Sequence, residues 1–556
     1  MKQEKIVIYQ VFTRLFGNKN SHCCPSGTLA ENGCAKMNDI DDHVLKSMKA
    51  MGVTHVWYTG VIRHASQTDY SAYGIPQQHA DVVKGKAGSP YAITDYYDVD
   101  PDLAVDVEHR MAEFEALVAR THKAGMKVII DFVPNHVARE YKSICKPDGV
   151  KDLGEDDDTF FHFSVRNNFY YCWGQPLDLS AIVGTTDNAS YQEIPARATG
   201  NDLFSNRPGP NDWYETVKLN YGVDYCDAGG RSEHFTPIPN TWGKMTDILL
   251  FWAQKGIDGF RCDMAEMVPA AFWAWATDKV KYCYPESVFI GEVYDPNQYR
   301  KYLASGFDYL YDKVGMYDCL RDVICGYRPA ADITRQWQSI DDIREHMLYF
   351  LENHDEQRVA SDFFAGNGHR AIPGLVVSAL LMRNPFMLYA GQEVGERGMD
   401  AEGFSGRDGR TTIFDYWQVG TIQRAYFDRR RMKKEERELL QKYQRVLLMA
   451  NQEKAVREGD TFDLMYVNSV LSERQFAFLR KADDEMLLVV ANFSDAATEL
   501  DVVIPRHAFD YLHISEKELT ATDLMTSETM KVVLRAEQPI HIIVGPYTAR
   551  IYKFQF

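Results

Sequence analysis

The sequence predicts an α/β fold, a (β/α)8 TIM barrel with a domain inserted after its third strand and an antiparallel β domain at its C-terminal end. Three observations predict it. Apolar, strand-like runs alternate with helical patterns over about the first 420 residues, which is typical of parallel βα units. Polar residues repeatedly end the apolar runs, at the face where such barrels carry their chemistry. Beyond residue 420, strand-like alternation becomes dominant, which favours an antiparallel sheet.

Eight apolar runs account for the barrel strands. The first is followed by a helical pattern at residues 39–51. The second is followed by Val107, Met111, Phe114 and Val118, whose spacings of four, three and four place them on one helical face. The eight runs are 5–12, 52–61, 125–136, 256–264, 287–295, 307–312, 348–355 and 385–393.

The interval between the third and fourth runs is far longer than an ordinary βα loop. It is rich in Asp, Asn, Gly and Tyr. We therefore expect residues 137–242 to form an inserted domain B, with residues 1–136 and 243–450 forming the barrel. Residues 451–556 are predicted to form a C-terminal antiparallel β domain.

Composition excludes several function classes. The 556 residues are 45% hydrophobic and 25% charged, with a formal charge of −18, so a nucleic acid partner is not expected. No run of about 18 apolar residues predicts a membrane span. The N-terminus lacks a signal-peptide pattern, which favours the cytoplasm unless a leader has been removed. The ten cysteines contain no C-x-x-C pair and are expected to be reduced thiols.

The segment GFRCDMAEM, residues 259–267, places Arg261 and Asp263 on the same face of a predicted strand. A buried ion pair often adds no net stability, so the pair indicates function, although a purely structural pair is the alternative. Repetition argues against that alternative, because polar residues end four of the runs. They are Asn135 and His136, Asp263, Glu292, and His354 and Asp355.

Four segments in this order resemble the signature regions of the α-amylase family, glycoside hydrolase family thirteen. They are DFVPNH (131–136), GFRCDMAEM (259–267), IGEV (290–293) and ENHDEQR (352–358). The stretches IYQVFTRLFG, YAITDYYDVDP and MLYAGQE extend the resemblance over the barrel. The resemblance implies a barrel, an inserted B domain and a C-terminal sandwich.

The resemblance also implies catalytic roles. Asp263 would be the nucleophile, Glu292 the general acid/base and Asp355 the transition-state stabiliser, with Arg261 holding Asp263 in its ionised form. Chemistry agrees, because a retaining glycosidase needs one ionised and one protonated carboxyl group ~5–5.5 Å apart. Neighbouring carboxylates and burial are expected to keep the proton on Glu292.

Further site residues are implied by the same resemblance. Tyr91 would stack on the sugar ring, His136 and His354 would bind its hydroxyl groups, and Asn353 and Arg358 would support them. Asn135 matches a calcium ligand of the family, so the sequence leaves calcium open, and no organic cofactor is expected.

Two departures from the family pattern leave substrate preference open. Many α-amylases carry a Lys-His pair where this chain has Glu266 and Met267. Lys218, in the segment ETVKLNYG, also departs from the family pattern and could shape the sugar sites or cap domain B.

We therefore expect a retaining hydrolase that cleaves α-1,4-glucosidic bonds in starch- or glycogen-derived maltooligosaccharides. A transglycosylase or an α-1,6-glucosidase of the same family is the alternative. A non-catalytic carbohydrate-binding homologue is less favoured, because all three carboxylates are present.

Overall fold

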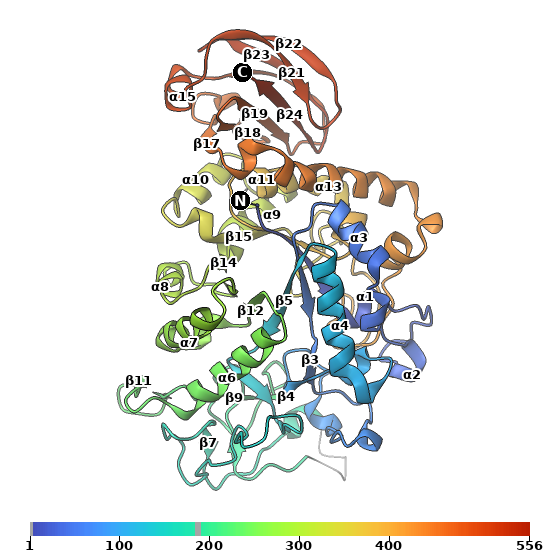
Figure 1. Ribbon diagram of the computed structural model, residues 1–556, viewed down its shortest axis with the longest axis vertical. Coiled ribbons are helices and arrows are strands. Elements are labelled where there is room, and N and C mark those ends of the chain that lie inside the picture. The colour runs from blue at the N-terminus through green and yellow to red at the C-terminus, as the bar shows by residue number, and fades with distance from the viewer. Residues whose placement is uncertain (1–3, 184–190) are drawn as a thin grey trace.

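The computed structural model describes residues 4–183 and 191–556. Figure 1 shows three parts along the long axis: a central barrel, the inserted segment at one end and the C-terminal sheets at the other. None of the described helices is long and apolar enough to cross a membrane.

The barrel is closed by eight parallel strands in the order β1-β16-β15-β14-β13-β12-β5-β2. Seven strands fall within the runs predicted from the sequence, and β15 begins one residue before its run. This confirms the predicted fold class. The strands are β1 (Val7–Phe12), β2 (His55–Thr59), β5 (Lys127–Phe132), β12 (Gly259–Cys262), β13 (Val288–Gly291), β14 (Tyr309–Tyr311), β15 (Met347–Phe350) and β16 (Phe386–Tyr389).

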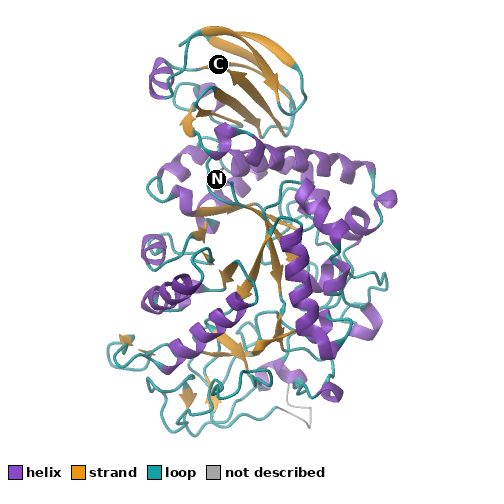
Figure 2. Ribbon diagram, in the orientation of Figure 1, coloured by secondary structure: helices purple, strands orange, loops and turns teal. Residues whose placement is uncertain are grey.

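The barrel interior is filled by large side chains from alternate strand positions. Ile8, Trp57, Ile129, Ile290 and Leu348 belong to one buried cluster, as expected for a packed barrel core. Helices surround the strands in Figure 2. The principal ones are α3 (Asp42–Ala50), α4 (Arg110–Lys123), α6 (Asn240–Gln254), α7 (Ala270–Cys283), α11 (Ile372–Leu380) and α13 (Lys434–Gln452).

Helix α4 illustrates how the sequence pattern directs packing. Phe114 and Val118, on the predicted apolar face, are buried. Val107 lies in a short 3-10 helix, η5 (Val107–His109), that precedes α4. The spacing therefore identified the helix, but Val107, the first residue of the pattern, lies in the more tightly wound 3-10 turn that precedes α4.

The segment between β5 and β12 is largely irregular. It contains short antiparallel strand pairs. In the first of them His136, four residues after the end of β5, pairs with Lys218. These pairs are β6 (His136–Ala138) with β9 (Thr216–Lys218), β7 (Tyr171–Cys172) with β8 (Ala196–Arg197), and β10 (Val223–Asp224) with β11 (Ser232–Glu233). A further pair, β3 (Ile62–His64) with β4 (Ile93–Val99), follows β2.

The C-terminal part contains a six-stranded sheet, β17-β18-β19-β24-β21-β22, and the separate pair β20-β23. All these pairs are antiparallel, which confirms the predicted β domain. The domain boundaries given above stay predictions. The strands are β17 (Asp460–Asp463), β18 (Gln475–Ala482), β19 (Glu485–Asn492), β20 (Thr498–Val503), β21 (Lys517–Asp523), β22 (Thr529–Leu534), β23 (Pro539–Val544) and β24 (Thr548–Gln555).

Candidate active site

One pocket at the carboxyl ends of the barrel strands brings most of the predicted residues together. It has a volume of about 230 Å³. Asp263, Glu292, Asp355, Tyr91 and His136 all line it. Arg261 and His354 lie directly beneath these groups and contact them. His136 and Asp355, more than 200 positions apart in sequence, therefore share one site because the barrel strands that precede them end on the same face.

Arg261 links two of the carboxylates. Its Nη1 lies 2.7 Å from Oδ1 of Asp263, and its Nη2 lies 2.7 Å from Oε2 of Glu292. Nη1 also lies 3.4 Å from Oδ1 of Asp131, which occupies the register position beside Arg261 on β5. The guanidinium is 1% exposed. Two carboxylates on neighbouring nitrogens of one guanidinium are close enough for the ~5–5.5 Å separation of a retaining pair.

The electrostatics of Asp263 follow from this crowding. Burial raises the pKa of Asp263 well above its usual range, and the negative charge of Glu292 adds to the effect, while Arg261 opposes both. Arg261 therefore lowers the pKa of Asp263, as expected from the sequence, but burial raises this pKa by more. Because Asp263 interacts strongly with neighbouring carboxyl groups, each apparent pKa belongs to the cluster rather than to one residue.

Besides Arg261, two hydrogen-bond donors contact Glu292. The Tyr294 hydroxyl donates to Oε1 at 2.6 Å, and the backbone N–H of Met264 donates to Oε2 at 2.8 Å. Met264 has a φ of 44°, a left-handed conformation that is costly for a non-glycine residue and is often found at functional sites. Tyr294 is not among the site residues predicted from the sequence. The period-two alternation that places it on the same side as Glu292 could have identified it.

Asp355 is paired with His354. Nε2 of His354 lies 3.0 Å from Oδ2 of Asp355, and Nδ1 contacts the Gln10 amide nitrogen at 2.7 Å. Burial raises the pKa of Asp355, but His354, together with the charges of Arg261 and Arg410, lowers it and holds it below the usual range. Asn353 supports the turn, since its Oδ1 accepts the N–H groups of Asp355 and Glu356 at 2.9 Å. Asp355 is therefore positioned as an anion.

Tyr91 stands against His354. The two rings are stacked with centroids 5.3 Å apart, and the Tyr91 hydroxyl lies 2.5 Å from Nε2 of His354. The predicted stacking of Tyr91 on a sugar ring stays a prediction.

His136 is neutral near pH 7, because burial, followed by the charges of Lys218 and Lys84, lowers its pKa to about 3. A neutral imidazole can both donate and accept hydrogen bonds, which suits the binding of sugar hydroxyl groups.

Arg358 contacts the loop behind the site. It donates to Oε2 of Glu352 at 3.0 Å, to the Ala390 carbonyl at 2.9 Å and to Oγ1 of Thr411 at 2.9 Å. Through these contacts Arg358 supports the loops behind the pocket.

The surroundings of Asn135 do not fit a calcium ion. Its side-chain oxygen accepts a hydrogen bond from Nζ of Lys218. The same ammonium lies 2.6 Å from Oδ1 of Asp202 and 3.2 Å from the Met267 carbonyl oxygen. Oxygen ligands of this kind suit Ca²⁺, but Lys218 already places a buried positive charge among them. An ammonium and a divalent cation would repel each other at this distance.

Within residues 4–183 and 191–556, two other groups have spacing compatible with a metal: Asp95, Asp98 and Cys145, and Asp224, Asp227 and His234. In the first group, Arg63 lies 3.2 Å from Asp95 and 3.4 Å from Asp98. The negative charge of these two carboxylates is therefore already balanced by an arginine of the protein. The second group lies on the surface of the inserted segment.

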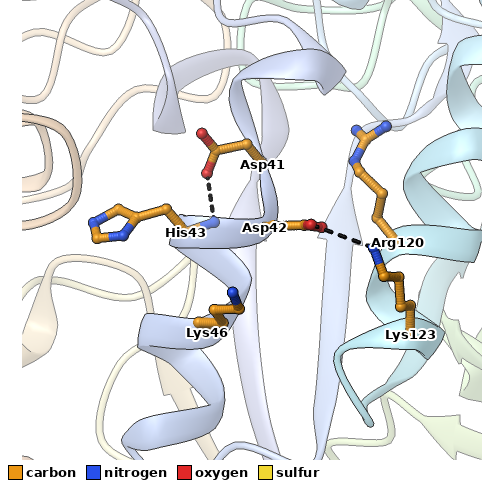
Figure 3. Close-up of a pocket in the computed structure, with 6 residues that line it drawn as sticks. All are labelled: Asp41, Asp42, His43, Lys46, Arg120 and Lys123. Carbon is orange, nitrogen blue, oxygen red and sulfur yellow. Dashed lines mark hydrogen bonds and ion pairs between the residues drawn. The ribbon is translucent and has the colours of Figure 1, made fainter.

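A second hollow lies on the outer surface between α3 and α4 (Figure 3). Its Asp41 caps α3 by accepting the N–H of His43 at 2.9 Å, and Asp42 pairs with Lys123 at 3.5 Å. Asp41 therefore serves as a helix cap and Asp42 as part of a surface ion pair. We assign no catalytic or binding role to this hollow.

The pocket at the barrel mouth also contains residues that carry no sequence signal. Lys84, Trp213, Glu215 and Phe414 line it from irregular loops. They have neither helical nor strand periodicity, so pattern analysis could not select them.

A model of the α-amylase catalytic domain matches residues 10–459. The chain belongs to the α-amylase family. This is a family of glycoside hydrolases, and the match agrees with the barrel and with the four strand-end segments.

Curated relatives are distant. The chain is 25% identical over 401 residues to α-amylase MalA of Haloarcula japonica, covering 71% of this chain and 45% of the relative. It is 22% identical over 416 residues to neopullulanase 2 of Thermoactinomyces vulgaris, covering 71% and 57%. The chain spans about half the length of the curated relatives it matches.

Solved structures extend the likeness to the whole chain. The α-amylase of Geobacillus thermoleovorans, complexed with acarbose, has a TM-score of 0.66 at 19% identity, and covers 100% of this chain and 99% of its own. The maltogenic α-amylase AmyB of Thermotoga neapolitana has a TM-score of 0.65 at 18% identity, with full coverage of both chains. These similarities support the fold of this α-amylase family member.

Proposed function

We propose that this protein is a retaining glycoside hydrolase that cleaves α-1,4-glucosidic bonds in starch- or glycogen-derived maltooligosaccharides. The observation that supports this most strongly is the meeting of Asp263, Glu292 and Asp355 in one pocket, with Arg261 joining the first two. In this proposal Asp263 is the nucleophile, Glu292 the general acid/base and Asp355 the stabiliser of positive charge at the sugar ring.

The reaction proceeds in two displacements. Asp263 forms a bond to the anomeric carbon while the glycosidic C–O bond breaks and Glu292 gives its proton to the leaving oxygen. Water then attacks the anomeric carbon, gives its proton to Glu292 and releases Asp263, so the α configuration is retained. Asp355, held as an anion by His354, stabilises the oxocarbenium-like transition states.

The metal requirement belongs to the same proposal. We infer that Lys218 supplies the positive charge between the inserted segment and the barrel, so that no calcium is required beside Asn135. The contacts of Lys218 with Asn135, Asp202 and Met267 support this.

The proposed function is tested by incubating the enzyme separately with maltoheptaose, pullulan, isomaltose, sucrose and trehalose. Products are identified over time, and the anomer first released is determined by NMR. We expect α-anomeric products from maltoheptaose and little from the other sugars. Longer oligosaccharides formed early would favour a transglycosylase, and preferential release from isomaltose would favour an α-1,6-glucosidase. No turnover of any substrate would contradict the proposal.

A further inference from the structure

Two loops form a wall along one side of the active-site pocket. Lys84 and Ser89 come from the segment between β3 and β4, and Ile413 and Phe414 come from the segment that follows β16. The N–H of Ala87 donates to the Phe414 carbonyl at 3.0 Å. The two segments therefore form one continuous surface, although more than 300 residues separate them.

Arg14 fixes this wall from behind. Its guanidinium is buried and donates to the Ala87 carbonyl at 2.9 Å, the Gly88 carbonyl at 3.1 Å and the Ile413 carbonyl at 3.3 Å. Gly85 has a φ of 66°, and a Cβ there would clash with the Phe414 carbonyl oxygen. The close approach thus depends on glycine, and the wall is a fixed part of the pocket.

The loops of the wall follow β2 and β16, which lie across the barrel from the strand that leads into Glu292. Strands β2 and β16 are the two neighbours of β1, and β13, which leads into Glu292, is four strands from β1 in either direction. The wall also adjoins Tyr91, whose N–H donates to Oγ of Ser89 at 3.2 Å. The pocket therefore has the proposed acid on one side and the two loops on the other.

This arrangement determines which part of a glucan can extend beyond the pocket. The acid must touch the leaving oxygen, so the leaving group departs on the side of Glu292. The sugar attached to Asp263 then has its non-reducing end toward the wall. The volume of about 230 Å³ lies below the ~300–1,000 Å³ usual for drug-sized ligands, which suits a single sugar ring.

A charged pair joins the wall to the inserted segment. Nζ of Lys84 is 2.9 Å from Oε2 of Glu215, with side-chain exposures of 10% and 6%. Both side chains line the pocket, and Lys84 also donates to the Asp212 carbonyl at 3.2 Å. Charged groups make strong hydrogen bonds, and the pair offers donors and an acceptor to neighbouring hydroxyl groups. A sugar substituted at those hydroxyls would leave the pair without its bonds.

We propose that this enzyme acts from chain ends, releasing single glucosyl units from the non-reducing end, and that Lys84 and Glu215 recognise the terminal hydroxyl groups. This inference rests on the proposed function and adds the position of cleavage.

The test compares p-nitrophenyl α-maltoheptaoside with the same compound carrying a 4,6-O-ethylidene group on its terminal sugar, together with β-cyclodextrin, which has no end. We expect glucose as the first product from the free-ended compound. The blocked and cyclic compounds should react at least ~100-fold more slowly, because a site built to bind hydroxyl groups rejects analogues that lack them. Comparable rates on the blocked or cyclic compound, or early release of maltose or longer products, would overturn the inference. Failure on all three compounds would contradict the proposed function instead.

Single-residue variants test which side chains cause the selectivity for free chain ends. Phe414→Ala opens the wall and should raise the blocked-to-free rate ratio at least ~10-fold, a ratio that does not depend on the amount of folded protein. Glu215→Gln should raise KM for the free-ended compound ~10–100-fold with a smaller change in kcat, as expected for lost binding that acts equally on ground and transition states. Glu233→Gln, an exposed position of the inserted segment, is the matched control. An unchanged rate ratio in Phe414→Ala would overturn the role given to the wall. Equal KM values for Glu215→Gln and Glu233→Gln, with melting temperatures preserved, would overturn the role given to Glu215.

Discussion

Arg261 and Asp263 form an ion pair inside the barrel, with 2.7 Å between Nη1 and Oδ1. Arg261 lies in β12 and Asp263 follows the last residue of that strand, and the two side chains point to the same side, as a period of two requires. The same guanidinium also contacts Glu292, so the pair belongs to a cluster of charges at the pocket floor. A pair that served stability alone would not need to contact a third group lining the pocket.

Replacing Arg261 should shift the pH dependence of activity. Burial raises the pKa of Asp263 and Arg261 opposes that rise, so Arg261→Gln should raise this pKa further. Because the nucleophile must be ionised, the acid limb of kcat/KM should move to higher pH by ~1–3 units, the usual effect of one nearby opposite charge. Arg430→Gln, at an exposed position, is the control. An acid limb that stays in place would contradict this account of Arg261.

Replacing Glu292 should affect substrates according to their leaving groups. Glu292→Gln removes the proton donor, so natural maltooligosaccharides should lose ~10²–10⁴-fold in rate. Activated aryl glycosides should lose far less in the first step, because they need little acid assistance. Added azide should restore part of their turnover as an α-glycosyl azide, since azide attacks the glycosyl-enzyme without a base and from the same face as water. An α-glycosyl azide formed by an Asp263 variant, with none formed by Glu292→Gln, would exchange the two roles.

Removing the Lys218 ammonium should create a calcium dependence that the natural protein lacks. Lys218→Ala frees the oxygens of Asn135, Asp202 and Met267. The variant should lose ~1–3 kcal/mol of stability, because buried polar groups lose their partner. Added Ca²⁺ should raise the melting temperature of the variant by mass action and leave the natural protein unchanged. A rise of the same size in both proteins would refute the role given to Lys218.

Acid should destabilise the fold through buried histidines. Burial, followed by the charge of Lys127, lowers the pKa of His55 to about 4. The unfolded chain then binds the proton more tightly, so the contribution of His55 is complete above pH ~6.5 and is lost as the pH falls toward 4. At 1.36 kcal/mol per unit, the loss is ~3 kcal/mol. Urea unfolding at pH 7 and pH 4.5 measures it.

His55→Gln should reduce the difference between the two pH values, and His43→Gln, at an exposed position, should leave it unchanged. The same pH dependence in His55→Gln as in the natural protein would show that the loss arises elsewhere.

The sequence predicted the barrel and the strand-end residues because both follow from short-range periodicity. Side chains alternate along a strand, and parallel strands all end on one barrel face, so Asp263, Glu292 and Asp355 could be placed together from the sequence alone. Tyr294 follows the same rule, although it was not predicted.

The wall of the pocket could not be predicted in this way. The hydrogen bond between Ala87 and Phe414 joins two irregular loops, and nothing in either loop reveals its partner. The Lys84–Glu215 pair depends on the same long-range contacts. The raised pKa of Asp263 was also beyond the sequence, because the balance between burial and Arg261 depends on how completely the carboxyl is enclosed.

The central claim is that Asp263 forms a covalent bond to the sugar. The test is to incubate the enzyme with 5-fluoro-α-glucosyl fluoride, which slows both steps and lets the glycosyl-enzyme accumulate. The peptide containing residues 259–267 is then analysed by mass spectrometry. We predict one glycosyl group attached to Asp263, and no attachment in a folded Asp263→Asn variant that has lost turnover. A glycosyl group on Glu292 or Asp355, or an Asp263→Asn variant that is still labelled and active, would contradict the account.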